Sequence, residues 1–203
     1  IANTHGQGGA ALAAIATGTT AWTNGLADVT AARSLSVAAG ATCQHIARVL
    51  VHGETDDANQ NANYATALST FNDNWNTEVA SIQGALPGGA RIRDFITQIS
   101  AWNSAPSRPT AIVALQQLTA SRDDPDIILV GPTYQYAYFS DRLHYSNTGH
   151  RHIGEKIGEV IYRVLRLGED WRPLEPNFIL ANNNNIDIYL HVPDPPIVVD
   201  THC

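Results

Sequence analysis

The stretch DIILVGP, residues 126–132, decides the fold. It is an apolar run about as long as one strand, and it ends at a glycine and a proline, which interrupt regular structure. A second apolar run, HIARVLVHG at 45–53, also ends near a glycine and predicts a buried strand over 46–51. RIRDFITQIS, at 91–100, predicts a further strand between these two.

Helical patterns separate the strands. Apolar residues recur at spacings of three and four over about 61–83, which predicts an amphipathic helix there. Further helices are expected at 26–39, at 109–122 with Pro109 in the first turn, and at 148–167, where Gly168 ends the helix. This alternation predicts an α/β fold of three layers (α/β/α), with a parallel sheet whose ligands bind at the carboxyl ends of the strands.

The sequence changes character after Trp171. WRPLEPNFILANNNNIDIYLHVPDPPIVVD, at 171–200, has two apolar runs joined by asparagines, which predicts a β-hairpin that opens a β-rich module. We therefore expect an α/β domain over 1–168, incomplete at its N-terminus, and an incomplete C-terminal module over 169–203. Because the chain has no Met and begins at Ile1, we interpret it as an interior segment of a longer polypeptide.

Composition excludes several classes of protein. A hydrophobic content of 44% and a charged content of 15% are typical of a soluble globular protein. The net charge of −7 opposes binding to nucleic acid or anionic lipid, and the absence of a long apolar run excludes membrane insertion. Cys43 and Cys203 could pair, but they have no zinc-site spacing, and no signal peptide is visible.

DRLHYSNTGHRHIGE, at 141–155, allows three interpretations. Asp141 and His144 have a spacing that suits two members of a nucleophilic triad, in which the carboxylate orients the imidazole that accepts a proton. Alternatively, His144, His150 and His152 could bind a metal, although two histidines two residues apart on a helix point in different directions. The third interpretation is the start of a helix that residues 146–148 cap and whose polar residues face solvent.

Two glycine-containing stretches lie near the other strand and the start of the chain. In VHGETDD, at 51–57, Gly53 permits a sharp turn after the strand, His52 can donate a hydrogen bond, and the acids can brace the loop or simply cap the next helix. In THGQGGAAL, at 4–12, Gly8 and Gly9 can present backbone N–H groups to an oxyanion, or form only a flexible loop.

Taken together, in this order and spacing, the motifs resemble those of the SGNH (GDSL-like) hydrolase superfamily, over about residues 3–167. The sequence is most similar to the carbohydrate-esterase branch that includes sialate O-acetylesterases and acetylxylan esterases. GQGGAAL resembles the family's glycine block, HGETD its third block, and DRLHYSNTGHRHIGE its terminal Asp-x-x-His block. The tail after Trp171 resembles the β-rich region of phage and prophage members.

The resemblance implies a role for each matching residue. His144 is expected to be the general base and Asp141 its orienting acid. Gly9, with Gly8, is expected to supply an oxyanion N–H, and His52, where the family commonly has Gln, to be the second oxyanion donor. The segment 53–56 completes the third block, with Glu54 and Asp56 as braces beside Gly53.

One departure from the family is large. Its serine block precedes the glycine block, whereas the first serine here is Ser34, within an expected helix. We therefore expect the nucleophile to lie outside these residues. The resemblance implies a carbohydrate O-acetyl esterase without a cofactor or a metal, extracellular or virion-associated, that acts on an O-acetylated polysaccharide or glycan. The alternative is a non-catalytic glycan-binding or structural module of a phage tail, in contact with other virion subunits or assembled as a homo-oligomer.

Overall fold

The structure is a computed structural model that describes residues 6–100 and 110–197. Its helices are α1 (Leu12–Ile15), α2 (Thr20–Ala38), α3 (Glu54–Ala58), α4 (Tyr64–Gln83), α5 (Ile112–Asp123) and α6 (Asn147–Ile161), which a π-helical turn at Tyr162–Leu167 extends. A short 3-10 turn lies at Pro87–Gly89. The strands are β1 (Ala47–Leu50), β2 (Arg93–Gln98), β3 (Ile127–Pro132), β4 (Glu175–Asn182) and β5 (Asn185–His191).

Within the described residues, β1, β2 and β3 form one parallel sheet in that order. Val49 lies opposite Phe95, and Phe95 lies opposite Ile128. Parallel neighbours need a crossover connection, and α4 and α5 provide the two crossovers. The mixed α/β architecture predicted from the alternating apolar runs is therefore confirmed.

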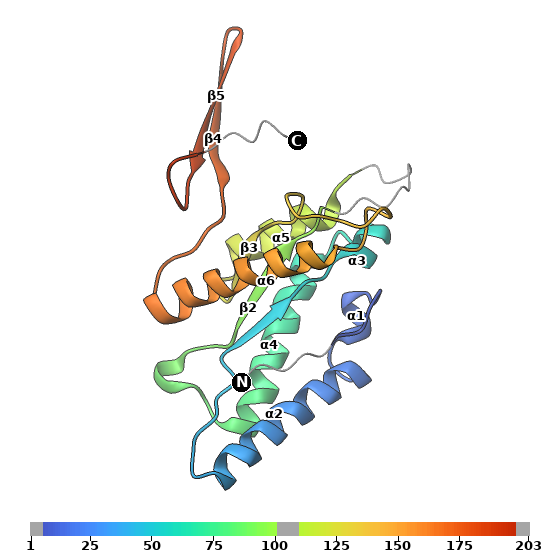
Figure 1. The fold of residues 1–203 in the computed structure, drawn as a ribbon, viewed down its shortest axis with the longest axis vertical. Coiled ribbons are helices and arrows are strands. Elements are labelled where there is room, and N and C mark those ends of the chain that lie inside the picture. The colour runs from blue at the N-terminus through green and yellow to red at the C-terminus, as the bar shows by residue number, and fades with distance from the viewer. Residues whose placement is uncertain (1–5, 101–109, 198–203) are drawn as a thin grey trace.

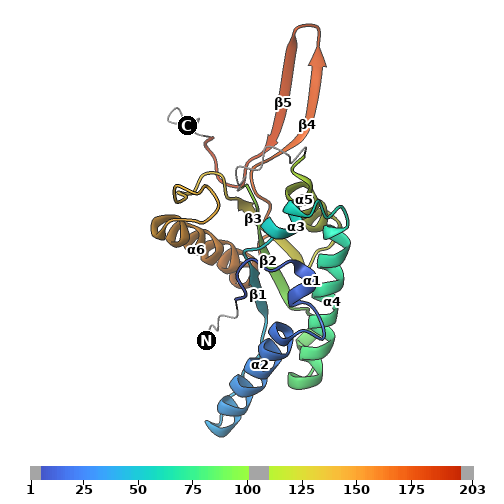
Figure 2. The ribbon, with the colours of Figure 1, turned by 90° about the vertical axis from the view of Figure 1, so that its right-hand side faces the viewer.

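Helices cover both faces of the sheet (Figures 1 and 2). Because successive strand residues point to opposite faces, Ile96 packs toward α4 and α5 while Phe95 packs toward α6. On the α6 face, Ile153 and Ile157 are buried, as the helical spacing predicts, and so is Val160. Two apolar clusters, one on each face, thus hold the sheet in place.

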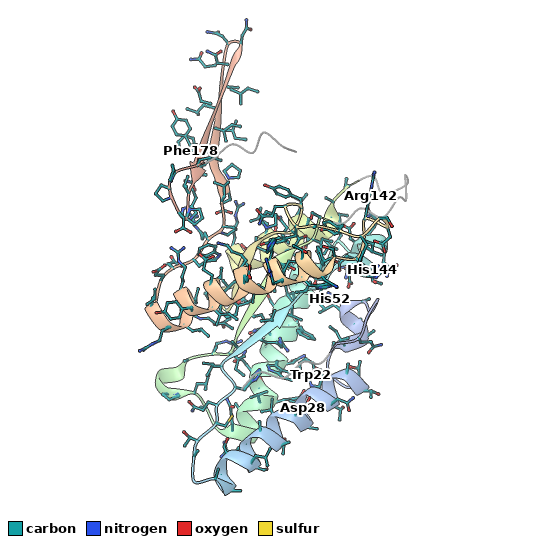
Figure 3. All side chains as sticks on the ribbon, in the orientation of Figure 1. Trp22, Asp28, His52, Arg142, His144 and Phe178 are labelled. Atoms are coloured by element: carbon teal, nitrogen blue, oxygen red, sulfur yellow. The ribbon has the colours of Figure 1, made fainter. Side chains whose placement is uncertain are left out.

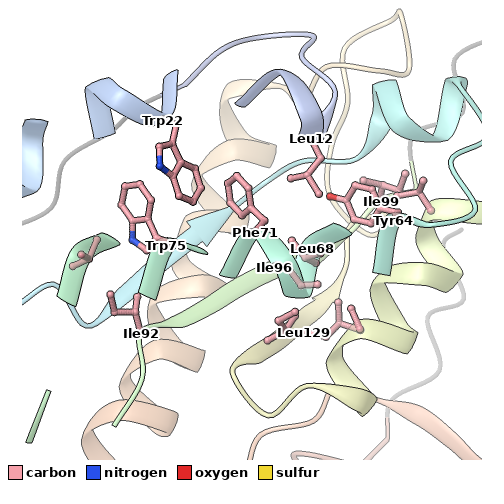
Figure 4. Packing of buried hydrophobic residues seen from close by; sticks show 14 residues of the cluster. Leu12, Trp22, Tyr64, Leu68, Phe71, Trp75, Ile92, Ile96, Ile99 and Leu129 are labelled. Carbon is pink, nitrogen blue, oxygen red and sulfur yellow. The ribbon is translucent and has the colours of Figure 1, made fainter. Parts of the chain in front are cut away.

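A cluster of aromatic rings anchors α2 to α4 (Figure 4). Trp22 packs edge-on against Phe71 and Trp75, with ring centres 5.1 and 5.0 Å apart. The guanidinium of Arg48, from β1, lies 4.1 Å from the ring centre of Phe71 and makes two hydrogen bonds to the buried carboxylate of Asp94. The positive charge of Arg48 is therefore paired with Asp94 and stacked against Phe71 at a position of low solvent exposure.

The segment after α6 is fixed to the body before it forms a hairpin. Gly168 ends the π-helical turn with a left-handed φ of 70°, as its position predicts. The buried indole of Trp171 donates a hydrogen bond to the carbonyl of Leu129, and the buried carboxylate of Glu175 pairs with Arg122 and Arg172. Beyond this base, β4 and β5 project away from the body as an antiparallel pair (Figure 1).

The predicted element boundaries differ from the structure in a few places. The helix expected at 26–39 begins at Thr20, because the hydroxyl of Thr19 caps it and Trp22 needs burial. The short helix α3 was not expected, because tertiary contacts rather than periodicity hold it. Pro109 and Cys203 lie outside the described residues, as does any pairing of Cys203 with Cys43.

Candidate active site

The chemically rich segments follow the carboxyl ends of two strands. The segment 52–57 comes directly after β1, and the loop 133–146 connects β3 to α6. Carboxyl ends of parallel strands meet at the same edge of a sheet, where α/β proteins commonly bind ligands. Figure 3 shows His52 beyond the end of β1, and Arg142 and His144 on the loop before α6.

The structure joins Asp141 and His144 directly. Nδ1 of His144 lies 2.8 Å from Oδ2 of Asp141, while Oδ1 accepts the backbone N–H groups of Leu143 and His144 at 2.9 and 3.0 Å. The hydrogen bond from His144, followed by the two backbone bonds, lowers the pKa of Asp141 to about 2. The carboxylate is therefore ionised at neutral pH and holds the proton of the imidazole on Nδ1.

This tautomer leaves Nε2 of His144 as the basic nitrogen. The side chain of His144 is 72% exposed and that of Asp141 is 49% exposed, so Nε2 is open to a reactant. Arg142 adopts a left-handed φ of 55°, and the N–H of Phe139 donates to the carbonyl of His144, which closes the loop. The hydroxyl of Ser146 caps α6 by accepting the N–H of Gly149, as the sequence predicts.

Residues 52–56, which follow β1, hold residues 6–12 by three hydrogen bonds. We call residues 6–12 the glycine segment. The carboxylate of Asp56 accepts the N–H of Leu12 at 2.7 Å, in a buried position. Thr55 donates to the carbonyl of Gly9 at 2.9 Å, and Nε2 of His52 donates to the carbonyl of Ala10 at 3.0 Å. The two stretches singled out in the sequence are thus one structural unit.

Gly8 and Gly9 present an open side of this unit. No atom lies within 4 Å of where a Cβ would sit on either residue, and both are exposed. Gly9 has a φ of 68°, a conformation that side-chain-bearing residues rarely adopt. Their backbone groups can therefore approach a ligand closely.

The ring of His52 has both nitrogens engaged within the protein. Because Nε2 donates to Ala10, Nδ1 accepts the hydroxyl of Tyr64 at 2.8 Å. Burial lowers the pKa of His52, an effect that the nearby charges of Asp56 and Glu54 oppose. A neutral ring with its proton on Nε2 fits these partners, and a direct role as oxyanion donor would require His52 to release Ala10.

Gly53 and Glu54 occupy different surroundings. Gly53 has a φ of 136°, and a Cβ there would lie 2.9 Å from Nε2 of Gln117. That amide donates to the carbonyl of His52 and accepts the N–H of Ile99, which ties the end of β1 to the end of β2. Glu54 begins α3, half-buried, and its charge acts on His52.

The negative charge of Glu54 also acts on Tyr145, the residue after His144. Burial is the main cause of the raised pKa of Tyr145, and Glu54 adds to it through its negative charge. Glu54 therefore lies within electrostatic reach of both His52 and the residue next to His144.

Sequence reasoning missed a group of hydroxyls at the ends of β2 and β3. The hydroxyl of Ser100 lies 2.9 Å from that of Thr133 and 3.1 Å from that of Tyr138. Ser100 lies 33 residues from Thr133 and 38 from Tyr138, so no local pattern could have joined it to them. Within the described residues, Ser100 makes no hydrogen bond to His144, so Ser100 does not complete a triad here.

The remaining histidines of this stretch contact their neighbours. His150 packs edge-on against Tyr145, and Nε2 of His152 lies 3.2 Å from the guanidinium of Arg151. Among residues 6–100 and 110–197, no group of three or more His, Cys, Asp or Glu side chains could hold a metal ion.

The chain was compared with known proteins in three ways. Neither protein-family models, nor curated proteins, nor solved structures gave a match. In the part of the chain that the structure describes, no helix is both long enough and apolar enough to cross a bilayer.

Proposed function

We propose that this chain carries the proton-handling part of a carbohydrate O-acetyl esterase of the SGNH type. One observation carries the proposal: Asp141 is ionised and bonded to Nδ1 of His144, whose Nε2 faces solvent. That arrangement suits a general base that takes the proton of an attacking serine and later gives it to the sugar oxygen as its bond to the acetyl carbon breaks.

The glycine segment suits the second requirement of ester hydrolysis. The carbonyl oxygen of an ester becomes negatively charged in the tetrahedral intermediate and needs N–H donors. Gly8 and Gly9 have open backbones, and three hydrogen bonds from residues 52–56 fix the segment that carries them. We assign the oxyanion role to the N–H of Gly9, with His52 holding the segment in place.

Among the described residues, no serine hydrogen-bonds to His144, and we propose that the nucleophile comes from outside residues 1–203. The free edge of β1 offers a place for it, because no described strand pairs there. On the face toward α6, Val49 and Val51 are 43% and 44% exposed, although parallel sheets are normally covered on both faces. A strand added parallel to β1 would end beside the glycine segment.

The β-hairpin fits a second function, that of a structural or glycan-binding module in a phage tail. Its apolar side chains are exposed, as expected for the start of a β-rich module that is covered in a larger assembly. In this reading the α/β domain binds an O-acetylated glycan without cleaving it, and the protein is associated with the virion.

The test is acetyl release from O-acetylated polysaccharide by a polypeptide that joins these residues to their upstream sequence. Wild type is expected to release acetate, and His144→Ala to lose activity by a factor of about 10³ or more. His150→Ala is the matched control, because His150 lies outside the Asp141 pair, and its activity should stay near that of wild type. Full activity in His144→Ala overturns the esterase assignment, and glycan binding without acetate release supports the second function.

A further inference from the structure

The hairpin of β4 and β5 leaves its surface almost wholly uncovered. From Pro176 to Leu190 every residue is exposed, and only Glu175 and His191, at the base, are buried or half-buried. Figures 1 and 2 show the hairpin projecting away from the helices and the parallel sheet. A lone two-stranded hairpin is marginally stable in water, so a covering partner would stabilise this one.

The register of the hairpin sorts its side chains into two unlike faces. Ile179 lies opposite Ile188 and Ala181 opposite Ile186, and strand alternation places Leu190 on the same side. We name this set (Ile179, Ala181, Ile186, Ile188 and Leu190) the aliphatic face. Pro176, opposite Leu190, extends this face, and Asn177 is the extra residue at the irregularity between Pro176 and Phe178. The named set contains no charged or hydrogen-bonding side chain.

The other face is mixed. Phe178 and Tyr189 stack there with ring centres 4.2 Å apart, followed by Leu180 opposite Asp187 and, at the tip, Asn182 opposite Asn185. The aromatic pair covers part of its own surface, and the tip is polar. The aliphatic face therefore has the greater need of a partner.

The size of the aliphatic face suits a weak but specific interface. Ile179, Ile186, Ile188 and Leu190 are 58, 69, 56 and 38% exposed. Covering them would remove about 400 Å² of apolar surface from each copy, or about 800 Å² from a pair, which is below the roughly 1,200 Å² at which stable complexes begin and is in the range of weak, transient ones. Patches of this size on a single chain commonly mark interaction sites.

The chemistry of the face favours a second copy of this chain as the occupant. An uncharged aliphatic surface offers no hydrogen bond or ion pair to a charged or sugar partner, and it complements an identical surface in a two-fold pair. The chain carries a net charge of −7, which opposes contact between the bodies of two copies. The hairpin contributes little to this repulsion, since Asp187 is the charged residue between Pro176 and Leu190, and it extends away from the bodies.

We propose that the hairpin is a self-association element, whose aliphatic face packs against the aliphatic face of a second copy. Two hairpins packed in this way form a small four-stranded sandwich with the isoleucines between the layers. The small area predicts a dimer in concentration-dependent exchange with the monomer.

The test is the mass of the 203-residue chain in solution, measured by light scattering or sedimentation over a range of concentrations. We expect the mass to rise from the monomer value of 21.9 kDa toward twice that value. In the double variant Ile186→Thr and Ile188→Thr, the β-branched shape is kept but the face becomes polar, and the dimer should be lost. Leu180→Thr, on the opposite face, is the matched control and should leave the dimer intact.

A second measurement does not depend on the variants folding. In a sample that mixes isotope-labelled and unlabelled wild-type chains, intermolecular nuclear Overhauser effects should link the methyl groups of Ile179, Ile186 and Ile188. A chain that stays monomeric at all concentrations overturns the proposal, and so does a dimer that survives the double variant. Intermolecular contacts that involve β1 instead of the hairpin also overturn it.

Discussion

Replacing Asp56 with asparagine tests whether residues 52–56 hold the glycine segment. Oδ2 of Asp56 accepts the buried N–H of Leu12 at 2.7 Å, and Oδ1 accepts the side-chain N–H of Asn61 at 2.8 Å. Asparagine has one oxygen and one NH₂ group, so one of these donors would face another donor. A hydrogen bond to a charged group contributes about 1.5–3 kcal/mol, and an unsatisfied buried N–H adds to the loss.

We therefore expect Asp56→Asn to lower the free energy of unfolding by about 2–4 kcal/mol. That is a large part of the roughly 5–15 kcal/mol typical of a domain. Urea denaturation measures the change in the free energy of unfolding, and amide hydrogen exchange at Leu12 shows whether the glycine segment is released. Glu54→Gln is the matched control, because it removes the same charge two residues away without removing a hydrogen bond of this kind. A loss below about 1 kcal/mol, with unchanged exchange at Leu12, would refute the reasoning.

The other predictions concern the Asp141–His144 pair, the protonation of His52 and the packing around Gly53. In His144→Ala, the pKa of Asp141 should rise from about 2 toward its ordinary value, because its main hydrogen bond is lost. NMR of the Asp141 carboxyl group measures this pKa, and an unchanged titration would contradict the pairing. Burial lowers the pKa of His52 in the folded state, so the unfolded chain binds more protons and stability falls as pH drops below about 6.5. Glutamine can still donate a hydrogen bond but does not titrate. In His52→Gln the free energy of unfolding should therefore fall less steeply with pH, as measured by denaturation at several pH values. Gly53→Ala should cost about 2–5 kcal/mol, because a left-handed backbone is strained and the new Cβ meets Gln117 at 2.9 Å; a cost below 1 kcal/mol would contradict this packing.

Local patterns were sufficient to predict most of the fold. The spacing of Ile153 and Ile157 predicts which side of α6 is buried, and the apolar run at 126–132 predicts β3. The spacing of Asp141 and His144 also indicated a pair, since they lie three residues apart on one tight turn, but the residues alone left three interpretations open and the family resemblance selected this one. Such features depend on interactions that a short window of sequence contains.

The supporting contacts of the site could not be predicted in this way. Thr55 reaches Gly9 across 46 residues, and Gln117 reaches His52 across 65. Tyr64 lies on the buried side of α4, and its hydroxyl also hydrogen-bonds Nδ1 of His52, a contact that the helical spacing does not indicate. Neither periodicity nor composition encodes which distant residue will meet a given polar atom, since that depends on how the crossovers pack.

The structure was also needed to decide what the acidic residues after β1 do. The acids of 54–57 could have capped the helix at 61–83, but they form the separate helix α3. The residue before α4 is Asn63, whose side chain makes no capping hydrogen bond. Asp56 and Asp57 are buried and bond backbone N–H groups of Leu12 and Val113. These acids therefore stabilise contacts between segments rather than a helix end.

Trapping the nucleophile tests the central claim most directly. A fluorophosphonate reacts with a serine hydroxyl that a neighbouring imidazole activates, and mass spectrometry identifies the modified residue. Applied to a polypeptide that joins these residues to their upstream sequence, it should modify one serine outside residues 1–203, much more slowly in His144→Ala than in wild type. If no serine reacts, or if the rate is the same in His144→Ala, then His144 and Asp141 are not the base and acid of a serine esterase.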